Sequence, residues 1–308
     1  MNRKSTHSAL WGVIFAVCMV SYSGPMVKGA LLEGATPLSI ALVRMLSAGL
    51  LLLPFDLQKC AKQRISFAFT CSQFLWTLLA AVLLAAHYLS WMTSLKGAST
   101  FASVSLVCTQ PLFVAGFSYL LFKETIAHRA VPGAALALLG ALLIALSGLV
   151  LQPSGAVTTR ESFGASMLAL TGAVVMAAHW LIARHIRLRL PAEVYTPVLY
   201  LFTGLFLALA LPVMGGFHMP IKALPYMAGL ILGSTLLGHA LFTVVISRVS
   251  PSVISFALLG EPVGAMLFAV LLFHEIPSPF VLLGGGITLL GLCLYLKATA
   301  SIQSRAES

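Results

Sequence analysis

The residues of this sequence that could do chemistry are the few ionisable ones that interrupt long apolar runs. Four of them stand well inside such runs: Arg44, His87, His239 and Glu261. On insertion scales an Arg or Asp at the centre of a bilayer costs at least about 2.5 kcal/mol, so each of these groups needs a structural or functional reason. They are therefore the first candidates for a binding site.

Arg44 carries a fixed positive charge and a planar guanidinium, which can hold a carboxylate through two parallel hydrogen bonds. The sequence therefore predicts that Arg44 binds an anionic group of a substrate. The structural alternative is an Arg that reaches toward the membrane surface or binds carbonyl groups where a helix is broken. Both interpretations remain open at this point.

His87 and His239 are 152 positions apart and occupy nearly corresponding places in the two halves of the chain. A symmetric pair of imidazoles facing a central cavity could bind substrate or carry protons. The alternative is that each imidazole forms a hydrogen bond to a neighbouring helix and only stabilises the packing.

Two Pro residues each follow a polar residue inside an apolar run, Pro111 after Gln110 and Pro262 after Glu261. Each Pro removes a backbone hydrogen bond and can kink its helix, which leaves a carbonyl group of the preceding turn without a partner. Gln110 and Glu261 could satisfy such groups. Alternatively, Glu261 faces the cavity, where a carboxyl in apolar surroundings can take up a proton or bind a substrate amine.

Several aromatic residues and one further histidine lie near these positions and could line a pocket around the body of a substrate. They are Tyr22, Tyr88, Trp91, His179 and Trp180. Most aromatic residues in membrane proteins serve instead as packing or as interface anchors.

The elements that must position these residues are membrane-spanning helices. The composition of 59% hydrophobic and 8% charged residues, with a mean hydropathy of +1.01, differs strongly from the roughly 25% charged residues of soluble domains. The apolar runs are too long and too uniform for barrel strands, and the first is read as a retained helix rather than a signal peptide. We predict ten transmembrane helices, near residues 8–29, 37–55, 74–95, 99–121, 130–150, 163–184, 194–214, 224–247, 251–273 and 278–297.

The basic residues predict the orientation of these helices. The net charge is +10, but the Lys and Arg residues are scattered singly between apolar runs and form no continuous basic stripe. Nucleic acid is therefore not an expected partner. With cytoplasmic termini, the loops outside would carry only Lys28, Lys96, Arg160 and Lys222. The inside would then carry Arg3, Lys4, Lys59, Lys62, Arg64, Lys123, Arg129, Arg184, Arg187, Arg189, Arg248, Lys297 and Arg305. This bias predicts that both termini are cytoplasmic.

An internal repeat organises the chain. Residues 99–143 align without a gap on residues 250–294, and this alignment places Pro111 on Pro262. It also pairs Glu124 with Glu275, Gly133 with Gly284 and Gly140 with Gly291. We therefore predict an all-α integral membrane protein of two five-helix repeats, residues 1–152 and 160–300. Because five is an odd number, the second repeat is inverted, as in many secondary transporters, with a site expected at the midplane.

With these motifs the sequence resembles the ten-helix EamA-type members of the drug/metabolite transporter superfamily. The resemblance rests on the runs 109–113 and 121–124 in the first half, and on 259–263 and 272–275 in the second. It covers nearly the whole chain. It implies an exporter of amino acids or related metabolites without fixing one substrate.

The sequence as a whole predicts a secondary transporter that exposes a central cavity alternately to each side of a membrane, most simply the inner membrane of a prokaryote. Its expected partners are a small-molecule substrate, the lipid bilayer and protons. We expect no enzyme activity, cofactor or metal, because the sequence has no phosphate-binding loop, catalytic triad or Cys/His ligand spacing. One alternative is an exporter of drugs or organic cations. Another is a membrane-embedded subunit or enzyme without transport activity.

Overall fold

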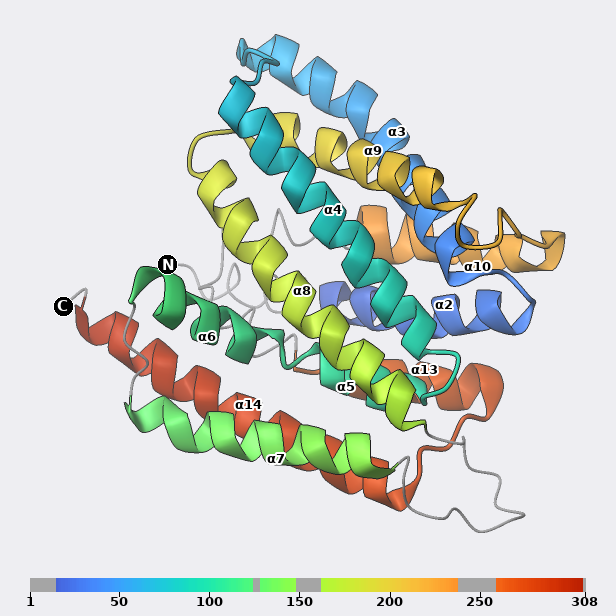
Figure 1. Ribbon diagram of the computed structural model, residues 1–308, viewed down its shortest axis with the longest axis vertical. Coiled ribbons are helices and arrows are strands. Elements are labelled where there is room, and N and C mark those ends of the chain that lie inside the picture. Colours follow the sequence, from blue (N-terminus) through green and yellow to red (C-terminus); the bar gives the residue numbers. More distant parts are fainter. Residues whose placement is uncertain (1–14, 124–127, 148–161, 238–258, 307–308) are drawn as a thin grey trace, which may run out of the picture.

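The computed structural model describes residues 15–123, 128–147, 162–237 and 259–306, and in these parts the regular elements are all helices (Figure 1). The first half contains α2 (Ser23–Leu32), α3 (Pro37–Gln63), α4 (Cys71–Ser94), α5 (Thr100–Val107), α6 (Gln110–Phe122), η1 (His128–Ala130) and α7 (Val131–Ser147). The second half contains α8 (Phe163–Arg187), α9 (Ala192–Ala210), η2 (Ile221–Ala223), α10 (Leu224–Ala228), η3 (Gly229–Leu237), α13 (Glu261–Phe273) and α14 (Pro279–Ala306).

The described part contains eight helices that are long and apolar enough to cross a membrane, together with two shorter apolar helices, Ile221–Leu237 and Glu261–Phe273. Each predicted run overlaps one of these ten helices. The prediction of an all-α membrane protein is therefore confirmed. The bounds differ in places: α3 continues to Gln63, eight residues beyond the expected 55, and Lys28 lies inside a helix instead of in an outer loop.

Local capping explains where several helices begin. The side chain of Thr36 accepts a hydrogen bond from the backbone N–H of Ser39 (3.2 Å) at the start of α3. At the start of α4, the backbone N–H of Gln73 donates to the Thr70 hydroxyl oxygen, and the backbone N–H of Thr70 donates to the Gln73 side-chain oxygen. A hydroxyl or carboxamide at these positions satisfies N–H groups that have no partner inside the helix.

The helices pair in a pattern that is unchanged when the two halves are exchanged. α3 packs on α9 and α7 on α14, and each of these two pairs joins corresponding helices of the two halves. α5 packs on α13, which is the counterpart of α6. α4 packs on α8, and its counterpart is the packing of α2 against α10 and η3. Figure 1 shows the first pair at one side of the molecule and α7 with α14 at the other. This arrangement is the two-repeat architecture that the sequence alignment predicts.

Glycine allows the backbones of α7 and α14 to touch. A side chain at Gly140 would meet the backbone of Gly284 and Thr288, and one at Gly291 would meet the backbone of Ala137. Small residues permit such close approach between membrane helices, where dispersion contacts replace the hydrophobic driving force. The glycines that the repeat aligns therefore lie in the contact between α7 and α14.

We expect Gly140→Ala to destabilise the protein, because its methyl group would collide with backbone atoms of α14 that cannot move separately. Overpacking of this kind costs about 1–3 kcal/mol. Gly286→Ala is the matched control: it lies on α14 with no atom within 4 Å of the new Cβ, and Ala favours a helix. Thermal unfolding in detergent should show a lower midpoint for Gly140→Ala alone. Equal midpoints would contradict this account.

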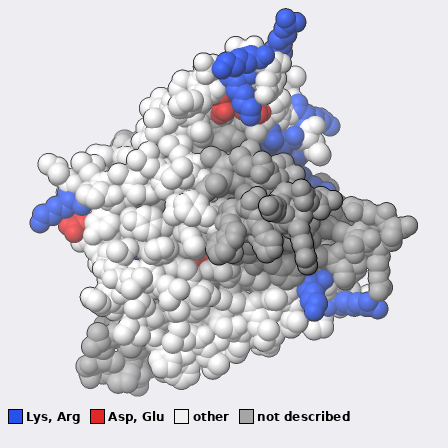
Figure 2. All heavy atoms as spheres, turned by 180° about the vertical axis from the view of Figure 1, so that it is seen from behind, with Lys and Arg blue, Asp and Glu red and all other residues white. Residues whose placement is uncertain are grey.

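The charged side chains that are visible on one face of the molecule lie mostly at its margins. In Figure 2 the Lys and Arg residues gather at the edges of the face that is shown, and the white surface between them carries few charges. Large apolar side chains are exposed on the surface of the helices, for example Leu120 and Leu271, which are 72% and 74% exposed. An apolar surface with charges at its margins suits contact with lipid hydrocarbon and not with water.

Candidate functional site

A pocket of about 180 Å³ lies between helices of both halves and brings together six of the residues that the sequence singled out. These six are Arg44, His87, Tyr88, Trp91, Gln110 and Glu261. The other residues that line it are Val20, Ser23, Val104, Val107, Cys108, Met176 and Ser234. The pocket therefore places one permanent cation and one carboxyl group in the same small space.

Arg44 lies in the first third of α3 and is only 6% exposed. Its Nε donates to Thr235 Oγ1 (3.0 Å) and its Nη1 donates to Ser23 Oγ (3.2 Å). The guanidinium carbon also lies 4.9 Å from the centre of the Tyr88 ring, a cation–π arrangement. The side chain is thus directed into the bundle and does not extend to the surface. Among the described residues, no carboxylate forms an ion pair with it.

The helix that supplies Thr235 is wound more widely than an α-helix. Residues 229–237 form a π-helix, and Thr235 Oγ1 donates to the carbonyl of Leu230, five residues earlier (3.0 Å). The same oxygen accepts the bond from Arg44. Wide turns of this type are uncommon and often occur at functional sites. Here the turn presents Thr235 to Arg44 while Ser234 lines the pocket.

Two histidines connect α4 and α8 in opposite directions. His87 Nδ1 lies 2.9 Å from the carbonyl oxygen of Gly172, and His179 Nδ1 lies 2.9 Å from that of Ala80. Each ring nitrogen that bonds a carbonyl oxygen must be the protonated one, since only an N–H can donate. His87 also lines the pocket, whereas His179 does not. His87 thus bonds the neighbouring helix and also lines the pocket, whereas His179 bonds the neighbouring helix outside the pocket lining.

We expect His87→Ala to lower transport per molecule, because it changes the pocket wall, whereas His179→Ala removes an equivalent interhelical bond away from the pocket. The two variants should lose similar amounts of thermal stability. The measurement is transport divided by the amount of folded protein in the membrane. Equal transport by His87→Ala and the parent would exclude His87 from the site.

Aromatic rings form one wall of the pocket. His87 stacks on Trp91 with ring centres 6.1 Å apart and planes 11° apart, and Tyr88 lies 6.2 Å from Trp91. The buried Trp91 Nε1 has no hydrogen-bond partner among the described residues. Buried indole N–H groups usually have a partner, so this donor is an exception in the wall of the pocket.

Glu261 and Gln110 begin two half-helices. In the first half, the helix predicted near residues 99–121 is divided into α5 and α6. Gln110 and Pro111 are the first residues of α6. Glu261 and Pro262 begin α13 in the same way. Pro fits the first turn of a helix because its missing N–H would have no partner there. A carboxylate at this end is favoured by the helix dipole. The buried Gln110 Oε1 has no partner among the described residues.

The remaining candidates are placed elsewhere. Tyr22 does not line the pocket; its ring packs edge-on against Phe268, with centres 5.3 Å apart, between α2 and α13. Trp180 is 50% exposed on α8 and also does not line the pocket. His239 lies outside the described residues. The structure therefore does not bring Tyr22 and Trp180 into the pocket with Arg44.

Several polar residues of the site were not predicted from the sequence. Ser23 and Thr235 hold the guanidinium of Arg44, and Ser234 lines the pocket. Their signal was weak, because Ser and Thr are common in membrane helices and satisfy themselves by bonding to the preceding turn. A second pocket of about 170 Å³ lies near Trp76, His185 and Arg189, and contains none of the predicted site residues.

Comparisons with known proteins agree with this architecture. A solved structure titled "Crystal structure of protein" matches with a TM-score of 0.63 and 17% identity, over 98% of this chain and 99% of that chain. This likeness shows the fold. No curated protein matches the sequence. The family model described as the EamA-like transporter family matches twice, at residues 7–146 and 164–297. Since these two matches span most of the sequence, one in each half, the chain belongs to the EamA-like transporter family.

Proposed function

We propose that this transporter moves amino acids or closely related zwitterionic metabolites, in the direction of export. The observation that carries the proposal is the presence of Arg44 and Glu261 in one pocket. A guanidinium suits the carboxylate of an amino acid, and a carboxylate suits its ammonium group. The rings of Tyr88 and Trp91 offer an apolar surface for the side chain.

The size of the pocket supports a small substrate over a bulky drug. Its volume of about 180 Å³ is below the roughly 300–1,000 Å³ of pockets that hold drug-sized ligands. Arg44 also opposes the alternative of an organic-cation exporter, because a cation would meet a like charge in a poorly hydrated space.

The proposed mechanism is alternating access, in which the two repeats rock about the pocket. Energy would come from the gradient of the substrate or of protons. Glu261 and His87 line the pocket and are the described candidates for proton carriers, while His239 belongs to the same hypothesis but lies outside the described residues. Glu261 could exchange a proton for the ammonium group of the substrate.

Reconstituted liposomes test the proposal. Liposomes that contain the purified protein are loaded with unlabelled amino acids, and the entry of labelled amino acids by exchange is measured, with Arg44→Ala as the control variant. We expect exchange of at least one neutral amino acid and much slower exchange by the control at low substrate concentration. Exchange of organic cations alone would support the drug-exporter alternative. No exchange of either class would favour a membrane subunit or enzyme.

We also propose that both termini face the cytoplasm of a prokaryotic cell, on the strength of the basic loops. Reporter fusions at the C-terminus should then report from the cytoplasm, and a fusion near Arg160 should report from outside. The opposite result at either position would reverse the assignment.

A further inference from the structure

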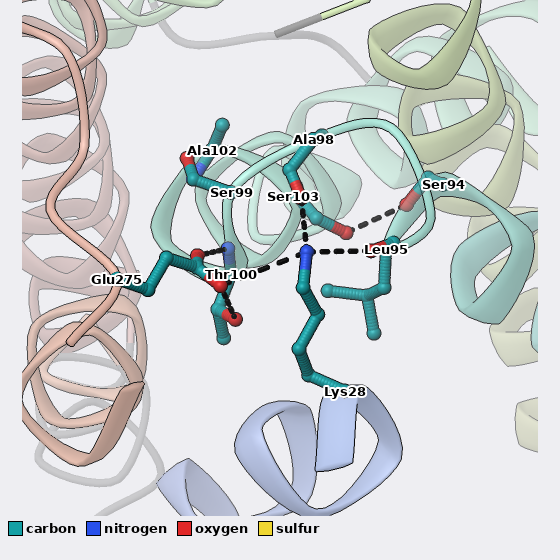
Figure 3. A network of polar contacts seen from close by, with 9 residues as sticks. All are labelled: Lys28, Ser94, Leu95, Ala98, Ser99, Thr100, Ala102, Ser103 and Glu275. Carbon is teal, nitrogen blue, oxygen red and sulfur yellow. Dashed lines mark hydrogen bonds and ion pairs between the residues drawn. The ribbon is translucent and has the colours of Figure 1, made fainter. Parts of the chain in front are cut away.

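A second buried polar cluster, whose residues do not line the pocket, joins the two repeats (Figure 3). Its centre is Lys28, near the end of α2, which is only 9% exposed. Lys28 Nζ donates to the carbonyl oxygens of Leu95 (2.8 Å) and Ala98 (3.1 Å), and lies 3.6 Å from Glu275 Oε2. The first three residues belong to the first repeat, whereas Glu275 belongs to the second.

Glu275 also holds the beginning of α5. It lies between α13 and α14 and is 7% exposed. Its Oε1 accepts a hydrogen bond from the backbone N–H of Thr100, and its Oε2 accepts one from Thr100 Oγ1 (3.3 Å). A carboxylate is stabilised at a helix N-terminus by the free N–H groups and the helix dipole. One side chain of the second repeat is therefore fastened to α2 and to α5 of the first.

The cluster lies directly beside the pocket along three helices. Ser23, Trp91 and Val104 line the pocket on α2, α4 and α5. Lys28 follows Ser23 by five residues, Leu95 follows Trp91 by four, and Thr100 precedes Val104 by four. At 1.5 Å per residue these steps are about 6–7.5 Å, and all three lead toward the same end of the bundle. The cluster thus separates the pocket from the end that carries the loops predicted to be outside.

The free energy of a buried ion pair allows the contact between the two repeats to open and close. The mutual attraction of the two charges is largely offset by the loss of hydration, so exchanging an intact buried pair for two hydrated groups changes the free energy little. Removing one partner is different, because it leaves an uncompensated charge in an apolar place. A complete pair can therefore open and close reversibly, whereas an incomplete one favours the hydrated, open arrangement.

From these observations we propose that Lys28 and Glu275 form the gate that closes the pocket toward the outside. The contact between the repeats at this end must part whenever the pocket opens to that side, and the pair is then hydrated. The proposal rests on the proposed alternating-access function. It assigns a role in transport to two residues that do not line the pocket.

A native cysteine makes the gate measurable without a substrate. Cys108 lines the pocket, so replacing the other four cysteines by Ser leaves one thiol as reporter. The measured quantity is the rate at which a small membrane-impermeant methanethiosulfonate reagent labels Cys108 from each side of the membrane. We expect Glu275→Gln and Lys28→Met to raise the rate from the Lys28 side by about tenfold or more, the size of a lost charge-assisted bond. Lys28→Arg keeps the charge and should label like the parent.

The second ion pair of the described residues supplies the matched control. Lys59 Nζ and Glu193 Oε1 are 2.6 Å apart and also join the two repeats, through α3 and α9. This pair lies near the last residues of α3 and the first residues of α9, at the end of the bundle opposite to Lys28. Glu193→Gln should leave labelling from the Lys28 side unchanged. A separate single-cysteine variant, Val213→Cys, identifies which side of the membrane is the Lys28 side. Val213 is 89% exposed in the loop after α9.

Two results would overturn the proposal: unchanged labelling of the folded fraction in both gate variants, or a rise of equal size from both sides of the membrane. The second result would indicate general loosening. Because labelling requires no substrate, a protein that labels as expected but exchanges no amino acid would refute the proposed substrate and leave the gate intact.

Discussion

Arg44→Ala is expected to weaken the binding of a neutral amino acid about tenfold to a hundredfold, because a charge-assisted hydrogen bond contributes roughly 1.5–3 kcal/mol. Arg44→Lys keeps the charge but loses the planar fork, so its affinity should lie between those of the parent and the Ala variant. Calorimetry on purified protein measures both. Unchanged affinity in Arg44→Ala would exclude a direct role of Arg44.

A structural role of Arg44 must be separated from this effect, since its guanidinium ties α3 to α2 and η3 through Ser23 and Thr235. The double variant Ser23→Ala, Thr235→Val removes both ties and keeps the guanidinium. It should lower the unfolding temperature with only a small change in affinity. If it reproduced the full loss of affinity, the tie between helices would explain the Arg44→Ala result.

Glu261→Gln should weaken the binding of the same amino acid about tenfold or more, because the amide keeps the shape of the side chain and removes the negative charge that faces the ammonium group. The matching carboxylic acid without the amino group is the decisive second ligand. Its affinity should be equal in the parent and in Glu261→Gln, and should fall in Arg44→Ala.

Glu193→Gln controls for the loss of a carboxylate elsewhere in the protein, since Glu193 pairs with Lys59 away from the pocket. Its affinity for both ligands should equal that of the parent. If Glu261→Gln bound the amino acid like the parent, the carboxyl group would serve only the start of α13. The amine site would then have to be sought at Gln110.

The sequence by itself was sufficient for the architecture. The apolar runs predicted the helices, because a bilayer requires each spanning segment to satisfy its own backbone and so fixes both its length and its composition. The repeat, which aligns Gly133 with Gly284 and Gly140 with Gly291, predicted two equivalent halves. Arg44, His87 and Glu261 were recognisable because ionisable groups are rare in apolar runs.

The tertiary structure alone decided which of these residues meet. In a membrane helix both faces are apolar, so the sequence does not reveal which side chains point toward the bundle and which toward lipid. This is why Trp91 lines the pocket while Trp180 is half exposed. The bonds that define the site join residues far apart in sequence, as in Arg44 and Thr235, which are 191 positions apart.

Lys28 illustrates the same limit most clearly. Its charge and its place at the end of an apolar run predicted an outer loop, and only the folded chain brings Glu275 and two free carbonyl groups to it. A charged side chain can be buried only where such partners converge, and their convergence depends on the packing of both repeats. Sequence periodicity therefore determined the helices of this protein, whereas the pairing of its few charges was decided by how the halves pack.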